Sequence, residues 1–153
     1  MAVIVTGATS FIGRGVVKAL LEEGCRVVAV SRPASAGAGK LQELFEDLKK
    51  QAWAEKKVFG SLELCFCELG EIEKLEKIYK KEELQAKAWL HLGWDGAGSD
   101  KRKDVKLQEK NIGYALQSLH TAAALGCKRF LFSGSQAEYG IGKEWEKEKQ
   151  EDQ

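Results

Sequence analysis

Short apolar runs of strand length alternate along this chain with stretches of helical period, and a single proline interrupts them. The run Ala2–Thr6 has the apolar, β-branched character of a strand, whereas the stretch 12–23 has the period of an amphipathic helix. Repeated strand–helix–strand units of this kind build parallel sheets. We therefore predict an α/β fold of the Rossmann type, with a doubly wound parallel sheet of about five strands.

The remaining elements are expected to follow the same alternation. Strands are predicted at 26–30, 62–67, 88–92 and 129–133, and helices at about 40–57, 72–81 and 104–125. The stretch 31–39 has the composition of a loop. In the last helix, the apolar residues at helical spacing are Ile112, Ala115, Leu116, Leu119 and Ala123. Gly24 and Gly126 are expected to end helices.

The composition argues against several classes of partner. Lys and Arg number 24 against 23 Asp and Glu, which leaves no basic field for nucleic acid or anionic lipid. No apolar run is long enough to span a bilayer, and the first residues carry no basic leader, so the expected location is the cytoplasm. The four cysteines lack zinc spacing, so we expect reduced thiols and no metal site.

The strongest functional signal is a glycine turn between the first strand and the first helix. This turn reads Thr6-Gly7-Ala8-Thr9-Ser10-Phe11-Ile12-Gly13. Its glycines allow a tight turn, and the N–H groups at a helix N-terminus can receive a pyrophosphate. Because the turn opens a series of strand–helix units, the sequence favours a dinucleotide site over a purely structural turn.

The end of the second strand bears on which dinucleotide would bind. An unmodified ribose requires an acidic residue there, but this chain has Ser31 and Arg32. A guanidinium at this position suits a 2′-phosphate, with a solvated loop arginine as the alternative. We expect NADP to be preferred over NAD.

The glycine turn resembles the TGxxGxxG fingerprint of the extended short-chain dehydrogenase/reductase family, the NAD-dependent epimerase/dehydratase family, with Ser10 in place of the middle glycine. Glu68-Leu69 matches the family's acidic-apolar pair, in which the acid is usually Asp and which reaches the adenine. His91-Leu92-Gly93-Trp94 is similar to its HLAx segment along the cofactor, and Asn111 matches its helix asparagine. For His91 and the Trp94 ring, plain packing is an equal alternative.

The resemblance assigns roles to individual residues. The cofactor-binding residues that it implies are Gly7, Thr9, Ser10, Phe11, Ile12, Gly13, Ser31, Arg32, Glu68, Leu69, Leu92, Gly93, Trp94 and Asn111. The segment 129–140 looks like the family's fifth strand and serine turn. There Ser135 matches the catalytic serine that hydrogen-bonds the reacting oxygen, with an ordinary turn serine as the alternative. Tyr139 matches the tyrosine of the substrate pocket.

The family completes its chemistry with a YxxxK pair on a long helix, in which the lysine lowers the pKa of the tyrosine. Tyr139 and Lys143 have this spacing, but the glycines between them make a poor helix, so we reject them as the pair. The pair, a sixth strand and the substrate-binding domain are expected beyond Gln153. The resemblance therefore implies an incomplete NAD(P)-binding Rossmann domain at 1–142, truncated before the YxxxK helix, and a polar, frayed tail at 143–153.

By resemblance, the chain is the NAD(P)-binding portion of a nucleotide-sugar epimerase, dehydratase or reductase. It is expected to be inactive alone, to bind a nucleotide-sugar-like substrate only in the complete protein, and to be compatible with a homodimer. A non-enzymatic NADP-binding sensor or interaction module is the alternative from another class. A third alternative is an unstable remnant with an open sheet edge and an uncovered apolar face.

Overall fold

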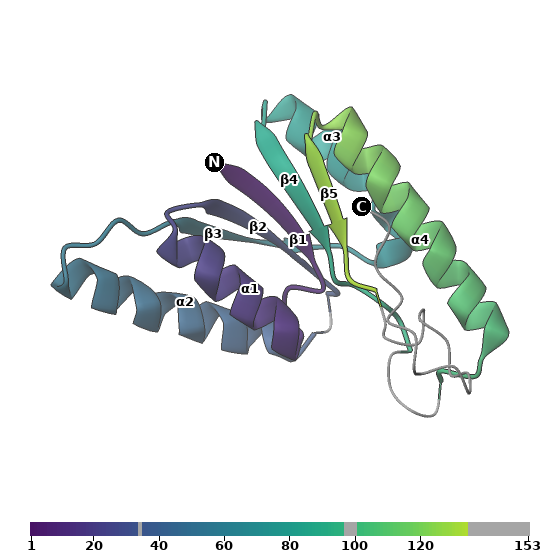
Figure 1. Cartoon of the computed structure of the whole chain (residues 1–153), viewed down its shortest axis with the longest axis horizontal. Helices are drawn as coiled ribbons and strands as arrows, with labels where there is room; N and C mark the ends of the chain where they lie inside the picture. Colours follow the sequence, from purple (N-terminus) through teal and green to yellow (C-terminus); the bar gives the residue numbers. More distant parts are fainter. Residues whose placement is uncertain (34, 97–100, 135–153) are drawn as a thin grey trace, which may run out of the picture.

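The computed structural model describes residues 1–33, 35–96 and 101–134. Within these ranges a five-stranded parallel sheet runs through the molecule (Figure 1). Its strands are β1 (Ala2–Thr6), β2 (Arg26–Ser31), β3 (Ser61–Phe66), β4 (Ala86–His91) and β5 (Arg129–Phe132). The spatial order is β3-β2-β1-β4-β5, so the direction of winding reverses between β1 and β4. The parallel, Rossmann-like sheet predicted from the sequence is confirmed.

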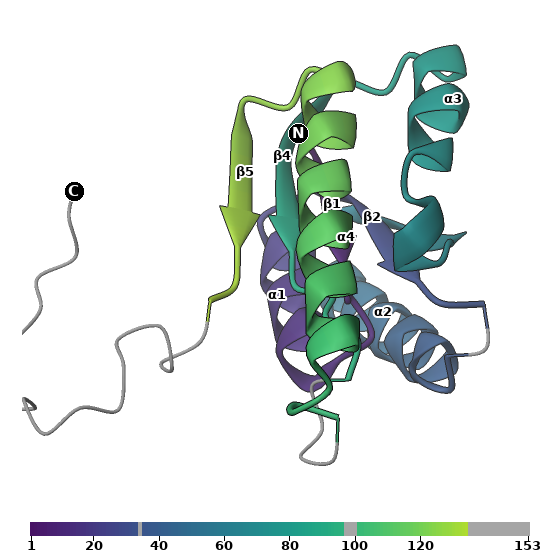
Figure 2. The ribbon, with the colours of Figure 1, turned by 90° about the vertical axis from the view of Figure 1, so that its right-hand side faces the viewer.

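Helices cover both faces of the sheet, as the crossovers between parallel strands require. α1 (Phe11–Glu22) and α2 (Gly37–Ala54) pack on one face, and α3 (Lys74–Lys81) and α4 (Val105–Ala124) pack on the other (Figure 1 and Figure 2). A short 3₁₀ turn, η1 (Leu69–Glu71), precedes α3. No helix in these described ranges is long and apolar enough to cross a membrane.

The sheet divides the core into two apolar clusters, because successive strand residues point to opposite faces. The cluster on the face of α1 and α2 contains Val3, Val5, Val17, Leu41 and Phe45. The cluster on the face of α3 and α4 contains Ile4, Ile72, Leu75, Tyr79 and Trp89. Nearly every residue of β1 and β2 is buried, which explains why their sequences are almost continuous apolar runs.

The start of α2 differs from the sequence prediction. The helix begins at Gly37, inside the stretch expected to be loop. The Oγ of Ser35 accepts a hydrogen bond from the Gly37 N–H at 3.3 Å and so supports the first turn. Gly37 also lies against the glycine turn, since a Cβ there would stand 2.8 Å from the Thr9 Cβ. The helix starts early because contacts with a distant segment hold it there.

The residues that α4 buries against the sheet are not the apolar residues whose spacing predicted the helix. The spacing predicted the helix, but Ile112, Leu116 and Leu119 are 56%, 53% and 41% exposed. The buried residues of α4 are Asn111, Ser118, Thr121 and Ala122. Ala122 lies in the same core cluster as the fully buried Trp89. A bulky ring on the strand is therefore matched by a small residue on the helix.

Candidate functional site

A cavity of about 590 Å³ opens at the carboxyl ends of β1, β2, β3 and β4. Its wall combines the glycine turn, the residues that follow β2, β3 and β4, the start of α2 and the loop before α4. Open parallel sheets bind ligands at this edge, at the point where the strand order reverses. The volume is typical of a pocket for a small molecule or a cofactor.

Glycines let the backbone approach the cavity closely. Gly7 has a φ of +70°, a conformation that L side chains rarely adopt, and a Cβ there would stand 2.6 Å from the carbonyl carbon of Leu92. A Cβ at Gly93, across the turn, would lie 2.9 Å from the Leu69 Cδ2. The turn is therefore pressed against the end of β4, and bare backbone lies where a pyrophosphate needs to approach N–H groups. The residues present fit a dinucleotide.

Ser10 stands where the family's fingerprint has its middle glycine, and it forms the N-cap of α1. Its Oγ accepts a hydrogen bond from the Gly13 N–H at 3.0 Å, and its own N–H donates to the Gly7 carbonyl oxygen at 3.0 Å. Serine is a favourable N-cap, so this departure from the fingerprint stabilises the start of the helix. Of the predicted residues in the turn, Gly7, Thr9 and Ser10 lie in the cavity wall.

Phe11, Ile12 and Gly13 are absent from the cavity wall. Phe11 and Ile12 are the first residues of α1, and their side chains are 87% and 64% exposed. Residues in a first helical turn can still offer backbone N–H groups, which have no partner within the helix. Gly13 is buried, and a Cβ there would collide with the Gly7 carbonyl oxygen. Its place in the fingerprint therefore has a packing explanation.

Arg14 is a wall residue that sequence reasoning missed. Its Nη1 donates a hydrogen bond to the Thr9 carbonyl oxygen at 2.8 Å. The Thr9 Oγ1 lies 3.1 Å from the Ser35 Oγ, so the glycine turn is tied to the loop after β2. One signal was available in the sequence, because Arg14 follows Ser10 by four residues and so shares its helical face.

Basic side chains dominate the charged part of the wall. Arg14, Arg32, Lys40 and Lys101 line it, against a single carboxylate, Asp95, among the described wall residues. Lys40, Lys101 and Asp95 were also missed, because isolated charged residues in loops and helices are mostly solvated surface. The predicted Ser31 and Arg32 both lie in the wall, with Ser31 buried and its Oγ donating to the Arg32 carbonyl oxygen at 3.3 Å. The positive charge suits an anionic ligand.

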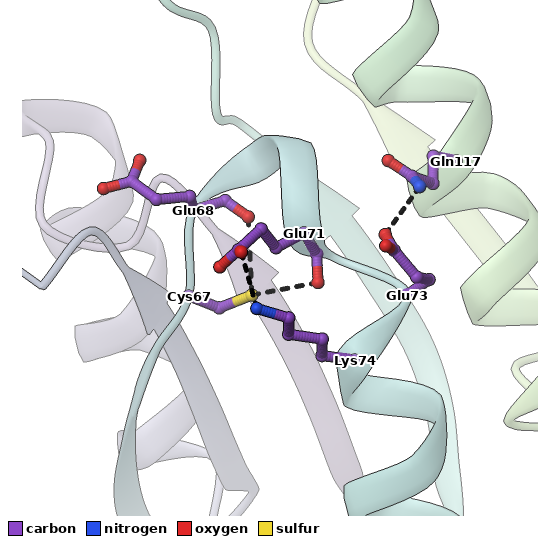
Figure 3. A network of polar contacts seen from close by, with 6 residues as sticks. All are labelled: Cys67, Glu68, Glu71, Glu73, Lys74 and Gln117. Carbon is purple, nitrogen blue, oxygen red and sulfur yellow. Dashed lines mark hydrogen bonds and ion pairs between the residues drawn. The ribbon is translucent and has the colours of Figure 1, made fainter.

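Of the predicted pair Glu68-Leu69 after β3, Leu69 lines the cavity and Glu68 does not. In Figure 3 the Glu68 carboxylate points away from the ion pair of Glu71 and Lys74. Cys67 also lines the cavity, and its Sγ donates to the carbonyl oxygens of Glu68 and Glu71, both at 3.4 Å (Figure 3). Burial raises the pKa of Cys67 to about 11. At neutral pH this thiol is therefore protonated.

His91 belongs to the core and not to the cavity wall, so the packing alternative holds for it. It is 1% exposed, and its Nδ1 lies 2.9 Å from the Thr6 Oγ1. Its ring stacks with Phe130 and Phe132 at centroid distances of 6.0 and 5.9 Å. Burial lowers the pKa of His91 to about 4. The residues that follow it, Leu92, Gly93 and Trp94, do line the cavity.

Two amide side chains of α4 hold the loop that follows β4. The Asn111 Oδ1 accepts from the Asp95 N–H at 2.9 Å, and the Asn111 Nδ2 donates to the Asp95 carbonyl oxygen at 2.8 Å. The Gln108 Oε1 accepts from the Trp94 Nε1 at 2.8 Å, and the Gln108 Nε2 donates to the Lys101 carbonyl oxygen at 3.1 Å. Asn111 is 1% exposed and absent from the cavity wall. Its side chain holds the backbone of Asp95, and the cofactor contact that the resemblance implies stays a prediction.

Ser135 and Tyr139, the predicted catalytic and pocket residues, lie outside the described residues, as does the tail at 143–153. Ser133 and Gly134, which precede them, are exposed and follow the carboxyl end of β5. The Ser133 N–H donates to the His91 carbonyl oxygen at 3.2 Å. Ser133 and Gly134 therefore lie at the edge of the sheet at which the cavity opens.

Residues 3–153 match the NAD dependent epimerase/dehydratase family. The chain belongs to this family. Membership was predicted from the glycine turn and the matches that follow it, and the prediction is confirmed. The family is described as NAD dependent, and this description agrees with the prediction that the cofactor is a nicotinamide dinucleotide. The predicted preference for NADP over NAD stays a prediction.

Individual relatives are considerably longer than this chain. The UDP-glucose 4-epimerase 2 of Arabidopsis thaliana is 30% identical over 148 residues, which cover 94% of this chain and 39% of that protein. The dTDP-6-deoxy-L-talose 4-dehydrogenase (NAD(+)) of Aggregatibacter actinomycetemcomitans is 31% identical over 141 residues, which cover 92% of this chain and 43% of that protein. The chain spans about two fifths of the length of these relatives.

A solved structure shares the fold. The UDP-glucose 4-epimerase from Bifidobacterium longum, in complex with NAD+ and UDP, matches with a TM-score of 0.71 and 19% identity. The match covers 95% of this chain and 40% of that protein. At this identity the likeness shows the fold alone, which is the Rossmann-like sheet described above.

Proposed function

We propose that this chain is the dinucleotide-binding portion of a nucleotide-sugar epimerase, dehydratase or reductase. The observation that carries the proposal is the cavity at the carboxyl ends of the strands, in which the glycine turn, Arg32 and Trp94 share one wall. Membership of an NAD dependent family supports a nicotinamide dinucleotide as the ligand. Relatives named for UDP-glucose and for a dTDP-sugar support a nucleotide-sugar substrate for the complete protein.

Within this proposal the chain prefers NADP to NAD. The end of β2 has no carboxylate for the 2′-hydroxyl of the adenosine ribose, because buried Ser31 and then Arg32 stand there. Arg14 and Lys40 line the same cavity and add positive charge. A 2′-phosphate supplies the anion that these cations favour. Since the family and the Bifidobacterium longum complex concern NAD, the preference rests on the residues of this chain alone.

The catalytic part of the proposal rests on the resemblance. Ser135 hydrogen-bonds the reacting oxygen, Tyr139 lines the substrate pocket, and a tyrosine with a nearby lysine exchanges the proton. The dinucleotide supplies hydride transfer when it is bound. We expect the chain by itself to show negligible activity, and a homodimer of the complete protein is compatible with this assignment.

Titration with NADP and with NAD tests the proposal. Trp94 lines the cavity, so binding should change tryptophan fluorescence, and it should also raise the melting temperature. We expect NADP to bind at least about tenfold more tightly than NAD, because a charge-assisted pair with a phosphate is worth this much. Arg32→Ala should remove most of the difference and change the affinity for NAD by less than about twofold.

Lys50→Ala is the matched control. It removes a positive charge from α2, at a side chain that is 77% exposed and outside the cavity wall, and should leave both affinities unchanged. Equal affinities of the wild type for NADP and NAD would contradict the preference. Absence of binding by either dinucleotide would contradict the assignment as a dinucleotide-binding protein.

A further inference from the structure

The backbone of Asp95, four residues after the end of β4, is held by a side chain of α4. Asn111 bonds both the N–H and the carbonyl of Asp95, at 2.9 and 2.8 Å, in the manner of a backbone partner. The next residue, Gly96, has a φ of +70°, so the chain turns sharply directly after Asp95. Because Asn111 is buried on α4, this anchor moves only with the helix. The backbone position of Asp95 at the cavity wall is therefore fixed by α4.

Asp95 differs in charge from its surroundings. It is the one carboxylate among the described wall residues, and four cationic side chains share that wall. A carboxylate facing a pyrophosphate would be unfavourable, because like charges repel. Carboxylates do accept hydrogen bonds from pairs of hydroxyl groups, as the acidic residue after the second strand does for a ribose in NAD-binding proteins of this fold. The chemistry of Asp95 suits a sugar diol.

The sheet topology decides which diol this is. A dinucleotide lies across the point where the strand order reverses, and its adenosine ribose lies at the end of β2. The reversal is between β1 and β4, so the other half of the dinucleotide extends over the side of β4, where Asp95 lies. We propose that Asp95 accepts hydrogen bonds from the hydroxyl groups of the second ribose, that of the nicotinamide half, and that Asn111 positions Asp95. The proposal rests on the proposed function, because it takes a dinucleotide as the ligand.

Three ligands of increasing length isolate the contact. ADP lacks the second ribose, ADP-ribose adds it, and NAD adds the nicotinamide. Asp95→Ala should weaken the binding of ADP-ribose and of NAD by about tenfold, which corresponds to one lost hydrogen-bonded charge. The affinity for ADP should not fall, because the variant removes a negative charge from a wall that faces phosphates. Calorimetric titration or thermal shift gives each affinity without any catalytic readout.

Matched variants separate contact from structure. Glu109→Ala removes a carboxylate from the exposed side of α4, outside the wall, and should leave all three affinities unchanged. Asn111→Leu keeps the volume but removes both bonds to Asp95, and should reproduce the loss confined to ADP-ribose and NAD. If Asn111→Leu fails to fold, which its melting curve would show, Asp95→Ala still decides the assignment of Asp95.

Several outcomes would overturn the inference. Equal losses for all three ligands would mean that Asp95 supports the fold of the loop and does not bind a ribose. A loss of affinity for NAD alone would place the contact on the nicotinamide. Unchanged affinities for all three ligands would show that Asp95 contacts none of them. These outcomes leave the proposed function intact so long as the wild type binds NAD or NADP, whereas a wild type that binds neither overturns both.

Discussion

Replacement of Gly7 by alanine should lower the free energy of unfolding by about 2–5 kcal/mol, from two costs that add. Gly7 has a φ of +70°, and an alanine in the left-handed region costs about 1–2 kcal/mol. Its Cβ would stand 2.6 Å from the carbonyl carbon and oxygen of Leu92 and 2.7 Å from the Gly93 nitrogen. These are backbone atoms that no rotamer change moves away, and overpacking of this kind costs about 1–3 kcal/mol.

Gly15→Ala is the matched control for the loss of a glycine. Gly15 lies in α1 and is exposed, and no atom beyond the local helix backbone would come within 4 Å of its Cβ. Alanine there should raise the free energy of unfolding by about 0.5–1 kcal/mol, because glycine is unfavourable in a helix interior. Urea unfolding followed by circular dichroism measures both variants against the wild type.

A Gly7→Ala protein as stable as the wild type would refute the reasoning. It would mean that the glycine turn is not pressed against the end of β4 and that the backbone can move aside for a methyl group. If Gly7→Ala and Gly15→Ala shifted stability in the same direction, the effect would belong to glycine in general and not to the turn.

Two buried side chains make further predictions. Burial lowers the pKa of His91 from 6.5 to about 4. As the pH falls below 6.5, the unfolded chain therefore binds a proton at His91 before the folded chain does. The free energy of unfolding should be highest above pH 6.5 and should fall by up to about 3 kcal/mol as the pH drops to about 4. His91→Phe should flatten this part of the pH profile, whereas His120→Phe, at an exposed position of α4, should retain it. The Tyr79 hydroxyl donates to Glu63 at 2.6 Å, so Tyr79→Phe should cost about 1–2 kcal/mol in urea unfolding. Burial raises the pKa of Tyr79 above 10.0, so the free energy of unfolding of the wild type should fall as the pH rises past that value. The same fall in a Tyr79→Phe variant would show that Tyr79 is not its cause.

Most elements could be predicted from the sequence because their signals are local. β1 was predicted at its observed bounds, and the helix predicted at 104–125 covers α4 together with its two caps, Asp104 and Leu125. The Asp104 side chain accepts a hydrogen bond from the Leu107 N–H at 3.1 Å, an interaction between neighbours in the chain. The start of α2 was missed because it depends on contacts of Ser35 and Gly37 with Thr9, about 26 residues away.

The sequence by itself determined the family, the parallel sheet and the glycine turn. The glycine turn is one short segment, and the sheet and the family follow from a series of such local patterns along the chain, where propensity and spacing decide the local structure. Only the tertiary structure decided that Arg14, Lys40 and Asp95 share one wall, since they come from α1, α2 and the loop before α4. It also decided that Asn111 holds a loop and that His91 faces the core. The surroundings of a side chain depend on how segments distant in sequence pack together, and no local pattern specifies that packing.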